Sequence, residues 1–234
     1  MTASSTSLSP PIVKICGTRT VQAAQCAISS GADLIGMIIV PNVKRTVSPE
    51  QAKAISRAVH EFRESRPPHE VASTDMPSEW FASHFEQIRL RAPLVVGVFR
   101  NQSLDEVLRL QKEYDLDIVQ LHGSEPLSWT RAIPVPVIKK FSPHENDLMT
   151  PGLHAVTLLD GGAGGEGQKI DWEGLPGSGP FMLAGGLTVD NVAIAVNIPN
   201  VFGVDVSSGV ETDGKQDLEK IKMFIRNAKA SRQQ

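Results

Sequence analysis

Eight short apolar segments, separated by stretches with helical periodicity, most constrain the fold of this chain. Each is rich in Val, Ile and Leu, which is typical of a strand buried on both faces. The segments are Ile12–Cys16, Leu34–Val40, Leu94–Phe99, Ile118–Leu121, Val135–Lys139, Ala155–Leu159, Phe181–Ala184 and Val201–Val206. Alternating strands and helices form parallel sheets with crossover helices, and eight units favour closure. We therefore predict an α/β fold, a single (β/α)8 TIM barrel.

Helix signals support this alternation. Ser48 precedes Pro49 and the acidic residue Glu50, which is the pattern of a capped helix start. Ser103 and Glu106 form a second capping box. The last helix has an apolar face made of Leu218, Ile221, Ile225 and Ala228.

Two segments fall outside the regular pattern. Residues 64–93 hold three prolines in or near their first half, and residues 78–91 have the periodicity of an additional amphipathic helix. We predict an insertion between helix 2 and strand 3, at the face of the barrel opposite the active site. Residues 1–11 are expected to be a disordered leader, and residues 12–234 to form one barrel domain.

Composition restricts the class of partner. The chain has 234 residues, close to the roughly 250 of a typical barrel, and a net charge of −3. This charge argues against nucleic acid, and no apolar stretch approaches the roughly 20 residues of a membrane helix. Two cysteines cannot form a disulfide framework. We expect a cytoplasmic monomer that acts on a small molecule.

Two consecutive segments near the C-terminus predict a phosphate site. Residues 181–187 and 201–211 each begin as an apolar strand that gives way to small residues, two glycines in the first and two serines with a glycine in the second. Small residues leave backbone N–H groups free to approach an anion. In (β/α)8 barrels, the loops after strands seven and eight frequently bind phosphate.

Candidate chemical groups are the polar side chains at the expected C-terminal ends of strands. They are Cys16, Arg45, His122, Lys139, Lys140, Asp160 and Asp205. Cys16 is either a small core residue or a base whose thiolate is favoured by cations such as Lys14. Arg45 either binds a carboxylate through two parallel N–H groups or is solvated at the surface. His122 is the single histidine among these positions, so we expect no multi-histidine metal site.

Asp160 is followed by the glycine-rich segment Gly161–Gly167. Its glycines match G-x-G-x-x-G, but no helix signal follows directly, so a dinucleotide site is not predicted. We interpret the segment as a flexible lid beside a catalytic acid. The alternative is a solvated turn that Asp160 merely closes.

Several segments together resemble the phosphoribosylanthranilate isomerase family of tryptophan biosynthesis. Their order and spacing match over nearly the whole chain. The segments are Val13–Gly17, Lys44–Ser48, Val96–Phe99, Val119–Gly123, Leu158–Asp160, Gly164–Gly167, Met182–Leu187 and Gly203–Glu211. The resemblance implies an Amadori rearrangement of N-(5-phosphoribosyl)anthranilate to 1-(2-carboxyphenylamino)-1-deoxyribulose 5-phosphate, without metal or cofactor.

The same resemblance implies residue roles. Cys16 would be the general base and Asp160 the general acid, and Arg45 would bind the anthranilate carboxylate. The substrate-binding set would further contain His122, Asp205, Gly185, Gly186, Ser208 and Gly209. Asp205 would contact a substrate hydroxyl or order the site.

Three alternatives remain from the residues themselves. A metal-dependent pentose-phosphate epimerase would share the phosphate cradle but needs clustered histidines. The next synthase of the pathway would need a lysine acid, for which Lys139 is available. A barrel that only binds phosphorylated ligands would bind without turnover.

Overall fold

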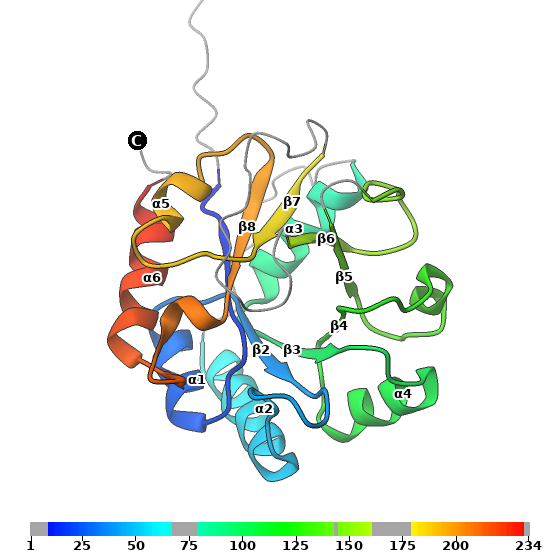
Figure 1. The fold of residues 1–234 in the computed structure, drawn as a ribbon, viewed down its shortest axis with the longest axis horizontal. Coiled ribbons are helices and arrows are strands. Elements are labelled where there is room, and N and C mark those ends of the chain that lie inside the picture. The colour runs from blue at the N-terminus through cyan, green and yellow to red at the C-terminus, as the bar shows by residue number, and fades with distance from the viewer. Residues whose placement is uncertain (1–8, 67–78, 143–144, 161–178, 232–234) are drawn as a thin grey trace, which may run out of the picture.

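The computed structural model describes residues 9–66, 79–142, 145–160 and 179–231. Eight parallel strands close into a barrel in chain order, with β1 paired to β8 (Figure 1). They are β1 (Ile12–Ile15), β2 (Leu34–Ile38), β3 (Leu94–Phe99), β4 (Ile118–Leu121), β5 (Val137–Phe141), β6 (Val156–Asp160), β7 (Phe181–Ala184) and β8 (Val201–Val206). The predicted (β/α)8 barrel is confirmed.

One strand prediction was wrong by two residues at each end. We predicted Val135–Lys139, and β5 runs from Val137 to Phe141. Val135 lies between two prolines, and a proline has no N–H to donate to a sheet ladder. The strand therefore begins after Pro136.

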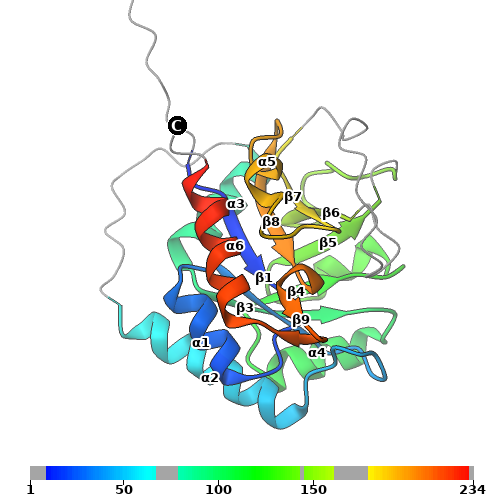
Figure 2. The ribbon, with the colours of Figure 1, turned by 60° about the vertical axis from the view of Figure 1, so that its left-hand side comes forward.

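Helices cover the outside of the barrel, although not after every strand. In Figure 2, α1, α2 and α6 lie side by side along one flank. The other elements in the described part of the chain are α1 (Val21–Ser29), α2 (Pro49–Glu64), α3 (Trp80–Arg91), α4 (Leu104–Glu113), η1 (Leu127–Arg131), α5 (Val192–Ala195), η3 (Ser208–Val210), β9 (Glu211–Thr212), β10 (Lys215–Gln216) and α6 (Leu218–Ala230). Between β4 and β5 there is only the short 3₁₀ helix η1.

The predicted helix caps are present. The Ser48 hydroxyl accepts a hydrogen bond from the Gln51 backbone N–H, and the Ser103 hydroxyl accepts one from the Glu106 N–H. These bonds satisfy N–H groups that a helix start leaves unpaired. The caps fix where α2 and α4 begin, directly after the loops that leave the site.

Side chains on each strand alternate between two hydrophobic clusters. On β1, Val13 and Ile15 pack outward against the helices, whereas Ile12 belongs to a cluster inside the barrel. On β4, Val119 and Leu121 face outward and Ile118 faces inward. Inward positions therefore recur every second residue toward the C-terminal ends of the strands.

The predicted insertion supplies the helix α3, which closes the N-terminal end of the barrel. Phe85 of α3 is fully buried in the interior cluster, with its ring centroid 5.6 Å from that of Phe202. The Trp80 indole N–H donates to the His154 carbonyl, 2.7 Å away, just before β6. In its described part, the insertion therefore lies opposite the strand ends that carry the polar candidates, as predicted. Its residues 67–78 lie outside the described residues.

The predicted leader falls mainly on residues 1–8, which are also outside the described residues, and the extent of the domain stays a prediction. Among the helices that the structure describes, none has the length and apolar character needed to cross a membrane.

Phe85→Ala should lower the free energy of unfolding by about 3–5 kcal/mol, because it leaves a cavity where α3 enters the barrel. Denaturant unfolding measures the loss. Ile194→Ala is the control, because this side chain is 62% exposed, and it should change stability by less than about 0.5 kcal/mol. Equal effects of the two substitutions would contradict a closing role for α3.

Candidate active site

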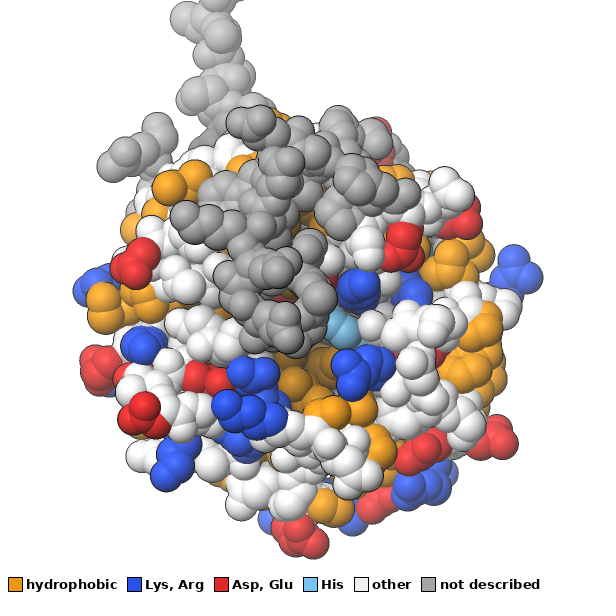
Figure 3. All heavy atoms as spheres, viewed as in Figure 1, with side chains coloured by type: hydrophobic (Ala, Val, Ile, Leu, Met, Phe, Trp, Pro, Cys, Tyr) orange, Lys and Arg blue, Asp and Glu red, His pale blue; other side chains and the backbone are white. Residues whose placement is uncertain are grey.

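A cavity of about 360 Å³ opens at the C-terminal ends of the barrel strands. Figure 3 looks onto this face, where Lys and Arg side chains surround a hollow that shows hydrophobic and histidine surfaces. The lining residues are Cys16, Ile38, Val40, Val43, Lys44, Arg45, Val98, Arg100, Gln120, His122, Asp160, Ala184, Gly185, Gly186, Leu187, Asp205, Val206, Ser207 and Ser208. Its size is within the range of small-molecule sites.

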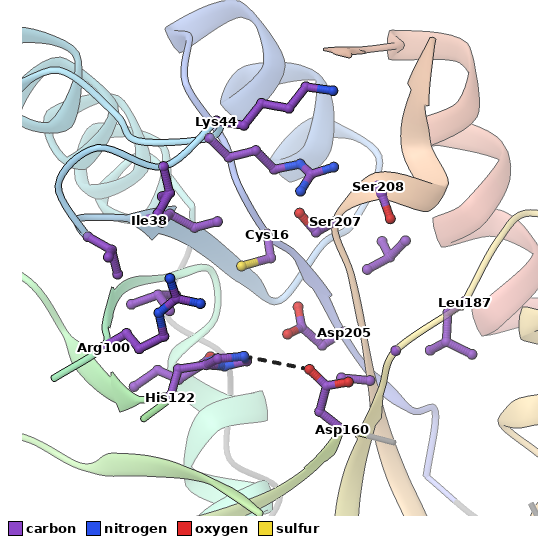
Figure 4. A pocket seen from close by; sticks show the side chains of 18 of the residues that line it. Cys16, Ile38, Lys44, Arg100, His122, Asp160, Leu187, Asp205, Ser207 and Ser208 are labelled. Atoms are coloured by element: carbon purple, nitrogen blue, oxygen red, sulfur yellow. Dashed lines mark hydrogen bonds and ion pairs between the residues drawn. The ribbon is translucent and has the colours of Figure 1, made fainter. Parts of the chain in front are cut away.

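The base of the cavity contains a buried ion pair. Lys14 is 0% exposed, and its Nζ donates to both carboxylate oxygens of Asp205 at 3.0 Å. The two residues are direct neighbours across the β1–β8 ladder. Cys16, two positions after Lys14 on the same inward side, points into the cavity (Figure 4). Gly36 makes room for it, since a Cβ there would lie 2.9 Å from the Cys16 Sγ.

Two opposing effects determine the protonation of Cys16. Burial raises the pKa of the thiol, and this effect outweighs the Lys14 ammonium, which favours the thiolate. Burial also disfavours the Lys14 ammonium, but the Asp205 carboxylate more than compensates and raises the pKa of Lys14. The lysine is therefore a permanent positive charge beside the sulfur.

Asp160 and His122 face each other across the cavity. The His122 Nε2 is 3.6 Å from the Asp160 Oδ2 (Figure 4). Burial, followed by the charges of Lys14, Lys140 and Arg100, lowers the pKa of His122 to about 4. The ring is consequently neutral near neutral pH. The segment Gly161–Gly167, which we predicted to be a lid, lies outside the described residues.

Arg45 is held by a carboxylate from the far end of the chain. Its Nε donates to the Glu211 Oε1 at 2.9 Å, and its Nη2 donates to the Glu211 Oε2 at 2.8 Å. Burial opposes ionisation of Glu211, but the hydrogen bonds and charge of Arg45 hold the pKa of that carboxyl below its usual range. A guanidinium has five N–H donors, so this pairing leaves the Nη1 edge available for a ligand.

The opposite end of the cavity is formed mainly by backbone. Gly185 and Gly186, after β7, have φ angles of 87° and 64°, which favour glycine. Ser207 and Ser208 follow β8 and line the same end. Gly209 lies behind them, where a Cβ would come within 1.9 Å of the Leu187 carbonyl oxygen. This close approach brings the two loops together.

Two cavity residues have buried polar atoms that lack a partner. In the described part of the chain, the Gln120 Oε1 and the Ser207 Oγ are buried without a hydrogen bond. Leaving such atoms unpaired is costly. A polar ligand in the cavity can supply what they lack.

The structure brings most of the predicted site residues together. Eight of them line one cavity: Cys16, Arg45, His122, Asp160, Asp205, Gly185, Gly186 and Ser208. Gly209 supports the cavity from behind without lining it. Lys139 binds the Glu125 carboxylate and the Gly123 carbonyl, and Lys140 donates to the Ser142 hydroxyl. Neither lysine lines the cavity, so the lysine acid of the synthase alternative is not in place.

Sequence reasoning assigned no role to three residues of this region: Arg100, Gln120 and Glu211. Arg100 follows β3 and continues the inward series of Val96 and Val98, so counting by twos would have found it. Gln120 precedes His122 by two residues on the same side of β4. Glu211 is 166 residues from Arg45 in sequence, and no local signal connects them.

Comparison with known proteins decides the family. Residues 62–227 match the family model described as N-(5'phosphoribosyl)anthranilate (PRA) isomerase. The chain belongs to the PRA isomerase family. The N-(5'-phosphoribosyl)anthranilate isomerase of Lipomyces starkeyi is 70% identical over 232 residues, covering 98% of this chain and 99% of that protein. This family membership makes the chain an enzyme of tryptophan biosynthesis, an aldose–ketose isomerase.

Solved PRA isomerases share the barrel. The Thermus thermophilus enzyme superposes with a TM-score of 0.70 at 30% identity, covering 92% of this chain and 97% of its own. A second PRA isomerase was solved in complex with reduced 1-(o-carboxyphenylamino)-1-deoxyribulose 5-phosphate. It gives a TM-score of 0.67 at 31% identity and covers 94% of this chain and 99% of its own.

In this PRA isomerase, Lys14→Met should shift formation of the Cys16 thiolate to higher pH, because it removes the cation beside the sulfur. The pH dependence of thiol alkylation, in a Cys26→Ser background, measures the shift.

Lys14→Met alone also leaves the Asp205 carboxylate buried without its partner, at a cost of about 3–5 kcal/mol. The double variant Lys14→Met with Asp205→Asn removes both charges and controls for this loss of stability. An unchanged alkylation profile in both variants would show that Lys14 has no influence on the thiol.

Proposed function

We propose that Cys16 and Asp160 are the general base and general acid of the isomerase reaction in this cavity. The observation that carries the proposal is their position. Both side chains enter one cavity, between an apolar wall with arginine at one end and a glycine- and serine-rich cradle at the other. An aromatic carboxylate and a sugar phosphate are the matching ends of phosphoribosylanthranilate.

The proposed first step is ring opening of the sugar. Asp160 gives its proton to the ring oxygen while the bond from that oxygen to the anomeric carbon breaks. The bonding electron pair stays on the oxygen, and the anthranilate nitrogen forms a C=N bond to the carbon. Asp160 must carry a proton when it acts. Its nearest histidine, His122, is neutral near neutral pH, so the ring adds no positive charge beside the acid.

The second step is proton removal. The iminium acidifies the neighbouring C–H, and the Cys16 thiolate takes this proton to give an enolamine. The enolamine then gains a proton at the carbon that bears the nitrogen and loses the proton of its enol hydroxyl, which gives the neutral aminoketone. These reaction steps use only proton transfers and require no metal. Among the residues that the structure describes, no group of three His, Cys, Asp or Glu side chains could hold a metal ion.

The two ends of the cavity would orient the substrate. The free Nη1 edge of Arg45 would bind the anthranilate carboxylate, with the ring against Ile38, Val43 and Val98. The backbone N–H groups around Gly185, Gly186 and Ser208 would bind the phosphate. Asp205 would reach a sugar hydroxyl from the base of the cavity, and His122 would lie beside the reacting carbons.

A cytoplasmic monomer remains our proposal for the state of the protein. It is supported by a substrate small enough to fit the cavity of one chain.

Cys16→Ala and Asp160→Asn should each lower kcat by about 10²–10⁴-fold, the usual contribution of acid–base catalysis. Loss of anthranilate-type fluorescence from freshly made phosphoribosylanthranilate measures turnover, with a chelator present. Cys26→Ala is the matched control, because Cys26 lies on α1 and hydrogen-bonds to the Leu218 carbonyl. Folded Cys16→Ala or Asp160→Asn protein with wild-type kcat would refute the assignment.

Glu211→Gln should raise KM about tenfold with a smaller effect on kcat, because an amide cannot hold both N–H groups of Arg45. Steady-state kinetics with phosphoribosylanthranilate separate the two constants. Glu113→Gln is the control, since this carboxylate pairs with Lys53 and Arg109 outside the cavity. An unchanged KM in Glu211→Gln would mean that the ion pair does not position Arg45.

A further inference from the structure

A hydrogen bond between Gln120 and His122 determines what His122 can offer to the cavity. Both side chains are inward on or just after β4, two residues apart. The Gln120 Nε2 is 3.0 Å from the His122 Nδ1. An amide nitrogen only donates, so Nδ1 must accept and carries no proton. In the neutral ring the proton is then on Nε2.

The protonated nitrogen is the one nearest to the proposed acid. The His122 Nε2 is 3.6 Å from the Asp160 Oδ2, longer than a good hydrogen bond. Figure 4 shows the imidazole edge and the carboxyl group facing each other. When Asp160 loses its proton and becomes charged, the Nε2–H of His122 can therefore approach the carboxylate and form a shorter hydrogen bond.

The surroundings of His122 keep its ring neutral. Burial is the largest cause of its low pKa, and Lys14, Lys140 and Arg100 add positive charge from β1, β5 and the end of β3. Glu125 acts in the opposite direction, but it is itself paired with Lys139 at 3.1 Å. With a pKa of about 4, the ring stays uncharged at neutral pH.

We propose that Gln120 is a positioning residue for the isomerase reaction: it holds His122 as the neutral tautomer with its proton on Nε2, so that Asp160 faces a hydrogen-bond donor. This inference rests on the proposed role of Asp160 as the acid. An imidazolium there would stabilise the carboxylate before reaction and deprive the acid of its proton. A lone pair on Nε2 would repel the carboxylate formed when the proton leaves. A neutral donor avoids both effects.

The remaining oxygen of Gln120 is consistent with this orientation. Gln120 is 1% exposed, and its Oε1 has no partner among the described residues. A sugar hydroxyl is a donor of the right kind for this atom. Bound substrate would then fix the amide in the orientation that donates to His122.

Nitrogen-15 NMR of the histidine rings tests the proposal, because the ring nitrogens report tautomer and charge directly. In the wild type, His122 should have its proton on Nε2 and titrate near the value of about 4. Gln120→Leu removes the donor to Nδ1, so the proton of the neutral His122 ring should no longer be confined to Nε2. Gln120→Glu should raise the pKa of His122 by placing a carboxylate at Nδ1. In both variants kcat should fall about tenfold or more, and in Gln120→Glu the acid limb of the pH–rate profile should move.

Two controls separate this role from a loss of stability. His154 is an internal reference, because its Nε2 lies near the Leu148 carbonyl away from the cavity, and its signals should not change. Gln111→Leu removes a comparable amide hydrogen bond, to the Leu116 carbonyl, and should leave kcat and the His122 signals as in the wild type.

A wild-type His122 with its proton on Nδ1, or one that titrates in the ordinary range of histidine, would overturn the proposal. So would Gln120→Leu protein with an unchanged tautomer and unchanged kcat. A failure of the proposed role of Asp160 would give a different result from a failure of this inference. In that case Asp160→Asn would keep its turnover while the His122 ring still carried its proton on Nε2.

Discussion

The ion pair between Lys14 and Asp205 is the interaction on which the rest of the site depends. It joins β1 to β8, the two strands whose pairing closes the barrel. A fully buried ammonium is tolerable only beside its counter-charge, so a slip in the register of this ladder would separate the two groups. The same pair places a positive charge next to Cys16 and a carboxylate at the base of the cavity. The strand pairing that closes the barrel therefore also assembles the base of the site.

Above and below this pair, the interior changes character in layers. At the N-terminal end, Phe85 of α3 and the first inward residue of each strand form an apolar floor. On β1 and β4 the next inward side chains are polar, Lys14 and Gln120, and the ones after these are Cys16 and His122, which line the cavity. On β3 and β6 the same middle layer is apolar, at Val96 and Leu158. The period of two along a strand converts position in sequence into depth in the barrel.

Sequence predicted the architecture and the ends of the eight strands to within two residues, because burial on both faces leaves a strong apolar signal and caps mark the helices. It identified Cys16 and Asp160 as candidates by the same logic, and the structure places both in one cavity. It missed Glu211, whose contact with Arg45 exists only after the barrel has closed. It also could not distinguish Lys139, which binds Glu125 beneath the loop after β4, from a residue that faces the ligand.

One end of the cavity is formed by apolar side chains and the other mainly by backbone. The apolar end consists of side chains such as Ile38, Val43 and Val98. The other end depends on glycine conformations at Gly185 and Gly186 and on the backbone contact at Gly209, where a single added methyl group would collide with Leu187. With the substrate oriented as we propose, evolution of this barrel toward other substrates would have an adjustable half and a fixed half: the group attached to the sugar could vary, whereas the anionic anchor would be inherited.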